Sequence, residues 1–313
     1  MKNFWNKIKK PILALAPMAG VTDSAFREIC RKYGADVVYT EMVSADGLYY
    51  DSKKTLELLQ FSKKEKPIVI QLFGKNPEKF TKAAEICTKH GFDGIDINFG
   101  CPAKKVVAHG GGVTLMRDLD NCHKIIEAVL KGTNLPVSVK IRAGIDKVTA
   151  LDFVDSIKDL DVSALMIHGR YFMNPFSGDI DFEMIKQVKK KFKGIVLGNG
   201  GINIPEDAKK MMATGVDGVG LARGVYGKPY LFKQIKDYLI KDSYLEIDRK
   251  LLKKIILEHA KLAFKTKGDH GLVELRKHLL WYVSGFSGAK NLRKELVEVK
   301  SLKDIQNISK KIT

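Results

Sequence analysis

Eight short apolar segments recur at even spacing through the first 240 residues, and this repetition constrains the fold more than any other feature. They occupy residues 12–16, 37–41, 68–73, 94–98, 137–141, 164–168, 194–198 and 218–221. Amphipathic stretches with helix-start signals lie between them, such as Asp23 ahead of residues 24–33 and Asn76-Pro77 ahead of the next helix. Eight strand–helix units within about 240 residues predict an α/β fold, a closed TIM (β/α)8 barrel. A doubly wound sheet is the alternative, which the even spacing disfavours.

The fourth apolar segment leads into a cysteine. Residues 95–99 alternate between apolar and polar side chains, which is the period of a strand, until Gly100 breaks the pattern. Cys101-Pro102 follows, and the residue before a proline is pushed into extended geometry. The sequence therefore predicts a thiol on a stiff loop just past the carboxyl end of a strand. Such a cysteine can be a nucleophile, a metal ligand, a proton donor or a small buried apolar residue.

Polar residues stand at or just after the ends of most of these strands, at the end of the predicted barrel where active sites lie. They are Gln71, Asn98, Lys140, Arg142, His168, Arg170, Asn199, Gly200, Gly201 and Arg223. The glycine pair and Arg223 suit a phosphate, because bare backbone N–H groups and a guanidinium can approach it closely. Lys140 would stabilise a ligand that becomes anionic on reduction, and the Gln71 amide matches the edge of a flavin or a pyrimidine. These residues favour a flavin mononucleotide (FMN) site over a sugar-phosphate site. Their chemistry alone does not exclude the sugar-phosphate site.

The strand–helix rhythm ends after Tyr244, where apolar residues recur at helical spacing over 251–264, 272–283 and 289–299. We therefore expect a barrel domain at 1–240 and a small all-α domain at 241–313. The second domain carries 17 Lys and Arg against 9 Asp and Glu, within a chain of net charge +18. Such an excess suggests a polyanionic partner, either nucleic acid or an anionic membrane surface, and solvated lysine-rich faces are the plainer alternative.

Hydropathy and the cysteines indicate in which cellular compartment the chain works. No apolar run reaches the roughly 18 residues of a membrane span, and the N-terminus has no apolar signal-peptide segment. The four cysteines, Cys30, Cys87, Cys101 and Cys122, show neither CxxC spacing nor the density of a disulfide framework. We expect a cytoplasmic chain in a reducing environment, with no membrane contact and no metal site.

Five motifs together resemble the tRNA-dihydrouridine synthases. They are residues 16–23 (APMAGVTD), 96–106 around Cys101 (DINFGCPAKKV), 139–142 (VKIR), 168–170 (HGR) and 198–202 (GNGGI). The similarity extends to Arg276-Lys277-His278 and Trp281-Tyr282, so it covers nearly the whole chain. The Cys-Pro-Ala-Lys-Lys-Val form is most similar to the bacterial B-type branch.

The resemblance implies a flavin barrel that uses NADPH as reductant. The positions that match FMN contacts are Ala16, Pro17, Met18, Gln71, Lys140, His168, Asn199, Gly200, Gly201, Ala222 and Arg223. Flavin N5 would deliver hydride to C6 of a uracil, and Cys101 would donate a proton to C5. A thiol with an ordinary pKa of about 8.5 is mostly protonated at neutral pH and can serve as that acid.

The resemblance also implies tRNA as the substrate. Matching or neighbouring positions in the barrel are Asn98, Lys104, Lys105, Arg142 and Arg170, and the helical tail would contribute Arg276, Lys277, Lys290 and Arg293. Unpaired loop uridines would be the cheapest bases to extract from the stack.

The sequence departs from the family pattern at two places. Ala222 replaces a glycine next to the expected phosphate, and Tyr171-Phe172 replace the usual Thr-Arg. Two other functions remain as alternatives: a flavin oxidoreductase acting on a small free pyrimidine or enone, and a tRNA-binding protein without catalysis. The first does not explain the basic tail, and the set of Cys101, Lys140 and His168 argues against the second.

Overall fold

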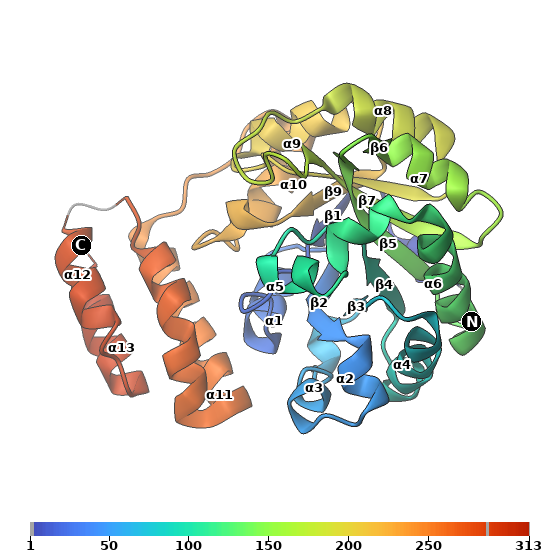
Figure 1. The fold of residues 1–313 in the computed structure, drawn as a ribbon. Coiled ribbons are helices and arrows are strands. Elements are labelled where there is room, and N and C mark those ends of the chain that lie inside the picture. The colour runs from blue at the N-terminus through green and yellow to red at the C-terminus, as the bar shows by residue number, and fades with distance from the viewer. Residues whose placement is uncertain (1–2, 286–287, 313) are drawn as a thin grey trace.

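The computed structural model describes residues 3–285 and 288–312. Its main body is a barrel of parallel strands ringed by helices, and Figure 1 shows the last helices standing to one side of it. The strands are β1 (Ile12–Leu15), β2 (Val37–Ser44), β3 (Ile68–Phe73), β4 (Gly94–Asn98), β5 (Val137–Ile145), β7 (Val162–Tyr171), β8 (Ile195–Asn199) and β9 (Gly218–Leu221). Neighbours pair in that order, and β9 pairs with β1, so the sheet is closed. The predicted TIM barrel is confirmed.

Three strands run three or more residues past the ends predicted for them: β2, β5 and β7. The pairing of β5 with β7 continues through Arg142 opposite His168 and Gly144 opposite Tyr171. A short strand, β6 (Val148–Thr149), then folds back antiparallel on the end of β5. These extra pairings extend β5 and β7, so Arg142 and Arg170 lie within strands rather than in the loops after them.

Alternate residues of β1 face two different apolar layers. In β1, Ile12 and Ala14 belong to the cluster inside the barrel, while Leu13 and Leu15 pack with the surrounding helices. Trp5, in the short helix η1 (Phe4–Lys7), is buried with the inner set. Apolar side chains therefore fill the inside of the barrel toward its amino end, and the inside is open at the end where the strands finish.

The helices around the barrel confirm the predicted strand–helix alternation. They are α1 (Ser24–Lys32), α2 (Ala45–Tyr49), α3 (Lys53–Glu57), α4 (Pro77–His90), α5 (Lys104–Ala108), α6 (Leu119–Gly132), α7 (Ala150–Ser156), α8 (Phe182–Lys191), α9 (Pro205–Met212) and α10 (Leu231–Lys241), with short 3-10 turns η2 (Lys63–Glu65), η3 (Gly112–Arg117) and η4 (Arg223–Val225). The Asp23 carboxylate caps α1 by accepting the Phe26 N–H at 2.8 Å.

The C-terminal residues fold into helices with a small core of their own. These helices are α11 (Arg249–Tyr282), α12 (Ala289–Leu296) and α13 (Leu302–Lys310), and we call them the tail. Gly268, at φ 57° and ψ −144°, breaks α11 into the two helices that the sequence predicts. The sequence analysis missed α13, although Ile305 and Ile308 lie at helical spacing and are buried in the tail core.

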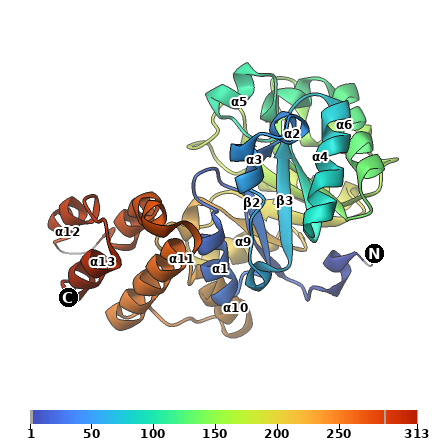
Figure 2. The same cartoon turned by 90° about the horizontal axis from the view of Figure 1, so that it is seen from below.

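The tail is attached to the barrel by ring contacts and packing. Figure 2 shows α11 lying beside α1, and Ile29 of α1 belongs to the tail's apolar cluster. Phe26 of α1 contacts the rings of His259 and His278, with centroids 5.6 and 4.6 Å away. Tyr226 stacks on Trp281 at 3.9 Å with an interplanar angle of 8°. In the described part of the chain, no helix combines the length and apolar character that crossing a membrane requires.

Candidate active site at the open end of the barrel

Two adjoining cavities open where the strands end. One has a volume of about 340 Å³ and the other about 370 Å³, and both sizes fall within the usual range for small-molecule sites. Five residues line both cavities: His168, Phe176, Asn199, Ala222 and Arg223. The first is also lined by Ala16, Pro17, Met18, Gln71, Asn98, Cys101, Lys140 and Arg142, and the second by Arg170, Gly200 and Gly201. Every residue predicted to contact a cofactor thus lines one of these two cavities.

A larger cavity of about 530 Å³ lies at the opposite, amino end of the barrel. Lys10 and Lys189 line it, and each donates to the Asp217 carboxylate at 2.5 Å. These two lysine charges are therefore already paired within the chain. The convergence of polar groups favours the open end as the functional site.

Cys101 sits on a turn that the side chain of Asn98 holds. Asn98 Oδ1 accepts the backbone N–H groups of Gly100 at 3.1 Å and Cys101 at 2.9 Å. The Cys101 thiol is half-buried, and burial raises its pKa, although a hydrogen bond from Ala103 and the charges of Arg142 and Lys140 act against this. The group is therefore a protonated thiol at neutral pH, which suits a proton donor better than a nucleophile.

Beneath Cys101, a buried carboxylate anchors a chain of polar contacts. Asp96 accepts hydrogen bonds from Ser138 Oγ and Gln71 Nε2, both at 2.6 Å. Burial raises the pKa of Asp96 to about 6, while these two hydrogen bonds and the charge of Lys140 act to lower it. Sequence reasoning missed Asp96, although a charged residue two positions before Asn98 in a fully buried strand was a readable signal.

Lys140 and His168 share the centre of the site. Burial and the charge of Arg142 lower the pKa of Lys140 to about 8, and its ammonium donates to Asn199 Oδ1 at 3.3 Å. Burial, together with Lys140 and the nearby arginines, lowers the pKa of His168 to about 2. His168 is therefore a neutral imidazole at physiological pH and cannot act there as an imidazolium acid.

Three arginines donate to one loop, which joins β7 to α8. Arg142 Nη1 donates to the Pro175 carbonyl at 3.1 Å, and Arg223 Nη2 donates to the Phe176 carbonyl at 2.9 Å. Arg170 Nε donates to the carbonyl of Gly178 in the same loop. Arg142 is only 3% exposed and also donates from Nε to the Gly100 carbonyl at 2.8 Å, so it links this loop to the Cys101 turn.

Tyr171 and Phe172, which depart from the family pattern, lie where β7 ends and this loop begins. The Tyr171 hydroxyl donates to Asp181 at 3.1 Å, and Phe172 packs against the main apolar cluster. The two aromatic residues therefore fasten the base of the loop in this chain.

The glycine pair leaves an open backbone cradle beside Arg223. Gly200 and Gly201 have φ angles of +107° and +72°, which other residues rarely adopt. A Cβ at Gly200 would lie 2.7 Å from His168 Nε2. With Arg170 and Arg223 around it and Lys140 in the adjoining cavity, this cradle fits an anionic group such as a phosphate. The methyl group of Ala222 borders both cavities and leaves the cradle open.

The residues predicted to contact RNA are spread over two regions. Lys104 and Lys105 are exposed at the start of α5, close in sequence to Cys101. Arg276 is half-buried and donates from Nε and Nη2 to the Val299 carbonyl at 3.1 and 2.8 Å, so it braces the tail.

The other three tail residues predicted to contact RNA lie in two different places. Lys277 is half-buried, and its Nζ would be 3.9 Å from a Cβ built at Gly20, so it faces the loop after β1. Lys290 and Arg293 are exposed on α12, the helix that Figures 1 and 2 show on the side of α11 away from the barrel. Among residues 3–285 and 288–312, no group of three His, Cys, Asp or Glu side chains is placed to hold a metal ion.

Comparison with known proteins places these features in a family context. The family model described as dihydrouridine synthase (Dus) matches residues 14–313. The chain is 35% identical over 286 residues to tRNA-dihydrouridine synthase B of Pseudomonas aeruginosa, covering 90% of this chain and 86% of that protein. It is 36% identical over 302 residues to a probable tRNA-dihydrouridine synthase of Rickettsia bellii, covering 92% of each.

A solved structure is similar in fold alone. The old yellow enzyme homologue from Zymomonas mobilis matches 79% of this chain and 94% of its own chain, with a TM-score of 0.55 and 13% sequence identity. This likeness supports the barrel architecture.

Proposed function

Because this chain belongs to the dihydrouridine synthase (Dus) family, we propose that it reduces uridine to 5,6-dihydrouridine in the D-loop of tRNA, with FMN as cofactor and NADPH as reductant. The observation that carries the proposal is the half-buried thiol of Cys101, which opens into the same cavity as Lys140 and His168. A protonated thiol and a cation in one cavity suit a reduction that also consumes a proton.

The two cavities fit FMN by the chemistry of their linings. The cradle of Gly200 and Gly201 with Arg223 would hold the phosphate, and the cavity lined by Pro17, Met18 and Lys140 would hold the ring system. FMN, when bound and reduced, supplies the hydride that adds to C6 of the uracil.

The chain's own residues handle the proton and the charge. Hydride addition at C6 leaves negative charge on C5 and O4 of the base, and the Cys101 thiol donates its proton to C5. Lys140, still largely cationic at neutral pH, stabilises negative charge in the cavity. Arg142 holds the Gly100 carbonyl and so keeps the thiol at the cavity wall.

In this proposal residues 241–313, which include the tail, form a tRNA-binding domain beside a catalytic domain at 1–240. The tRNA-binding domain's charge of 17 Lys and Arg against 9 Asp and Glu suits a polyanion. Four unpaired cysteines and a tRNA substrate favour the cytoplasm as its location.

One experiment tests the proposal against both alternatives. The purified protein is expected to carry FMN and, with NADPH, to form dihydrouridine in an unmodified tRNA transcript, measured by nucleoside mass spectrometry. Free uridine and free uracil at the same concentration are the controls, and they are expected to leave NADPH oxidation at its background rate. Turnover of the free bases would favour a small-molecule oxidoreductase, and a colourless, inactive protein that binds tRNA would favour a binder without catalysis.

The exposed cations of α12 give a separate prediction about RNA binding. Lys290→Ala combined with Arg293→Ala is expected to weaken tRNA binding and to lower the slope of log Kd against log salt concentration by about 1 to 2. The reason is that each phosphate contact releases condensed counterions when it forms. Filter binding at several salt concentrations measures the slope.

Lys190→Ala combined with Lys193→Ala is the matched control for that variant. It removes the same charge from exposed positions on and after α8, on the wall of the barrel. An equal loss of slope in both double variants would mean that α12 has no particular role in holding the RNA.

A further inference from the structure

Asp96 is a fully buried carboxylate that the mechanism above does not use. It lies on β4 within the barrel, two positions before Asn98, so both side chains leave the strand on the same face. Burying a carboxylate is costly unless its oxygens are hydrogen-bonded, and both Asp96 oxygens accept hydrogen bonds here. One of these partners, Gln71, also contacts Asn98, and Asn98 holds the Cys101 turn.

The carboxylate fixes the direction of the first amide. An ionised carboxylate can only accept hydrogen bonds, so the NH2 end of Gln71 must face Asp96, where Nε2 donates at 2.6 Å. The oxygen end of the same amide then faces Asn98.

Gln71 in turn fixes the direction of the second amide. Gln71 Oε1 accepts from Asn98 Nδ2 at 2.8 Å, and Nδ2 also contacts Met42 Sδ at 3.0 Å. Asn98 Oδ1 is thereby turned toward the loop, where it accepts the N–H groups of Gly100 and Cys101. Reversing the Asn98 amide would set donor against donor at Cys101 and acceptor against acceptor at Gln71, leaving buried groups unpaired.

We propose that Asp96 is a positioning residue for Cys101, acting through the directed sequence Asp96, Gln71, Asn98 and the backbone N–H of Cys101. Its importance for catalysis rests on the proposed role of Cys101 as proton donor. The hydrogen-bond relay itself is a separate claim about the thiol's surroundings, and it can be tested without RNA.

The test measures how fast iodoacetamide alkylates Cys101 as a function of pH, read at the Cys101 peptide by mass spectrometry. Burial is the main cause of the raised pKa of this thiol, so a released turn exposes it and lowers that pKa. For Asp96→Ala we expect the midpoint of the pH profile to fall by about one unit, which makes alkylation at pH 8 up to about tenfold faster.

Three further variants separate the relay from simpler effects. Gln71→Met is expected to shift the midpoint like Asp96→Ala, and the double variant is expected to shift it no further, because both changes break one sequence of bonds. Asp96→Asn is expected to keep the native midpoint, since its amide oxygen can accept from Gln71 while its NH2 donates to Ser138 Oγ. Ser138→Ala removes the other partner of Asp96 and is also expected to keep the native midpoint.

Two results would overturn the proposal. A native midpoint in folded Asp96→Ala or Gln71→Met would show that the relay does not hold the turn, and an equal shift in Asp96→Asn would assign the effect to charge. Thermal melting checks that each variant folds. If Asp96→Ala does not fold, the result for Gln71→Met alone decides the test. Because alkylation needs neither uridine nor hydride transfer, its outcome is independent of whether the chain reduces tRNA.

Discussion

Cys101→Ser is expected to form dihydrouridine about 10²- to 10⁴-fold more slowly than the native chain, which is the usual contribution of a positioned general acid. A serine hydroxyl is a far weaker acid than a thiol, so the negative charge on C5 is quenched slowly. The Cys101 thiol is already protonated at neutral pH because burial raises its pKa, so the variant loses an acid rather than a thiolate.

Single-turnover reduction of tRNA by the prereduced enzyme measures this effect apart from flavin reduction. The FMN content and the rate of flavin reduction by NADPH are expected to stay close to native, because the proposed mechanism uses Cys101 only to protonate the base. Cys122→Ser is the matched control: Cys122 is buried and donates to the Leu115 carbonyl at 3.1 Å, a bond that a hydroxyl can also make. Full activity in Cys101→Ser, or loss of FMN from it, would contradict the assigned role.

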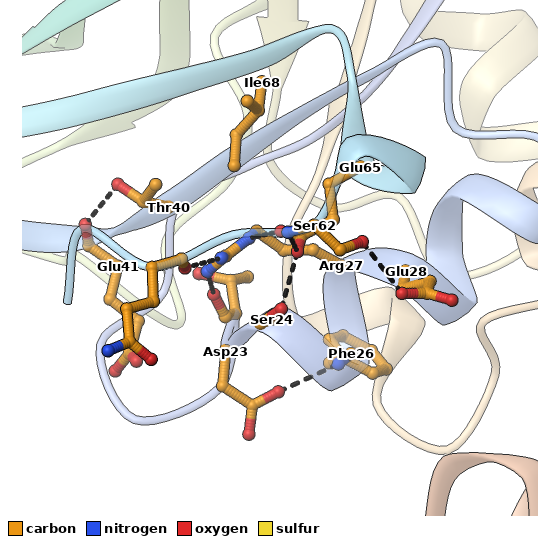
Figure 3. A network of polar contacts seen from close by, with 12 residues as sticks. Asp23, Ser24, Phe26, Arg27, Glu28, Thr40, Glu41, Ser62, Glu65 and Ile68 are labelled. Atoms are coloured by element: carbon orange, nitrogen blue, oxygen red, sulfur yellow. Dashed lines mark hydrogen bonds and ion pairs between the residues drawn. The ribbon is translucent and has the colours of Figure 1, made fainter. Parts of the chain in front are cut away.

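Glu65→Gln is expected to lower the free energy of unfolding by about 3–5 kcal/mol, the range for breaking a buried ion pair from one side. Arg27 and Glu65 are 3% and 0% exposed and lie 2.6 Å apart. Glu65 also accepts from Ser24 Oγ at 2.5 Å, so this carboxylate gathers several donors, as Figure 3 shows. The uncharged amide leaves the Arg27 guanidinium buried without a counter-charge.

Urea unfolding of the two proteins measures the change. Glu127→Gln is the control, because Glu127 pairs with Lys131 on the exposed face of α6, and such pairs contribute about 0–1 kcal/mol. The double variant Arg27→Met with Glu65→Leu is expected to be more stable than Glu65→Gln, since it removes both charges. A change below about 1 kcal/mol for Glu65→Gln would show that the pair is dispensable.

The same ion pair supports the loop after β1. Arg27 Nη1 donates to the Thr22 carbonyl at 2.6 Å, and Thr22 Oγ1 accepts the Met18 N–H at 3.1 Å. Met18 lines the first cavity. A folded Glu65 variant is therefore also expected to hold FMN less tightly.

The sequence was sufficient to predict the barrel and the gathering of Cys101, Lys140 and His168 at one end. Both follow from topology, because a closed parallel sheet brings the carboxyl ends of all its strands together whatever their distance in sequence. The direction of the Gln71 and Asn98 amides could not be read in this way. It depends on which side chain of a neighbouring strand each amide contacts, and the amino-acid sequence does not give these contacts.

The arginines illustrate the same limit. The sequence predicts that positive residues near strand ends contact an anion. Arg142, however, is buried, and two of its N–H groups donate to the carbonyls of Gly100 and Pro175. A guanidinium has five N–H donors, so one side chain can brace a loop and still face a ligand. Which donors are already used is decided by packing in three dimensions.

The flat stacking of Tyr226 on Trp281 has a consequence for how a nucleotide would be selected. With the contacts of Phe26 to His259 and His278, it holds the tail against the barrel at two places. A tRNA bound to the tail would then place one of its nucleotides at the Cys101 thiol, because the distance between the tail and the thiol is set by the protein. The uridine that reacts would then be chosen by its distance along the folded RNA, with no need to read the bases on either side.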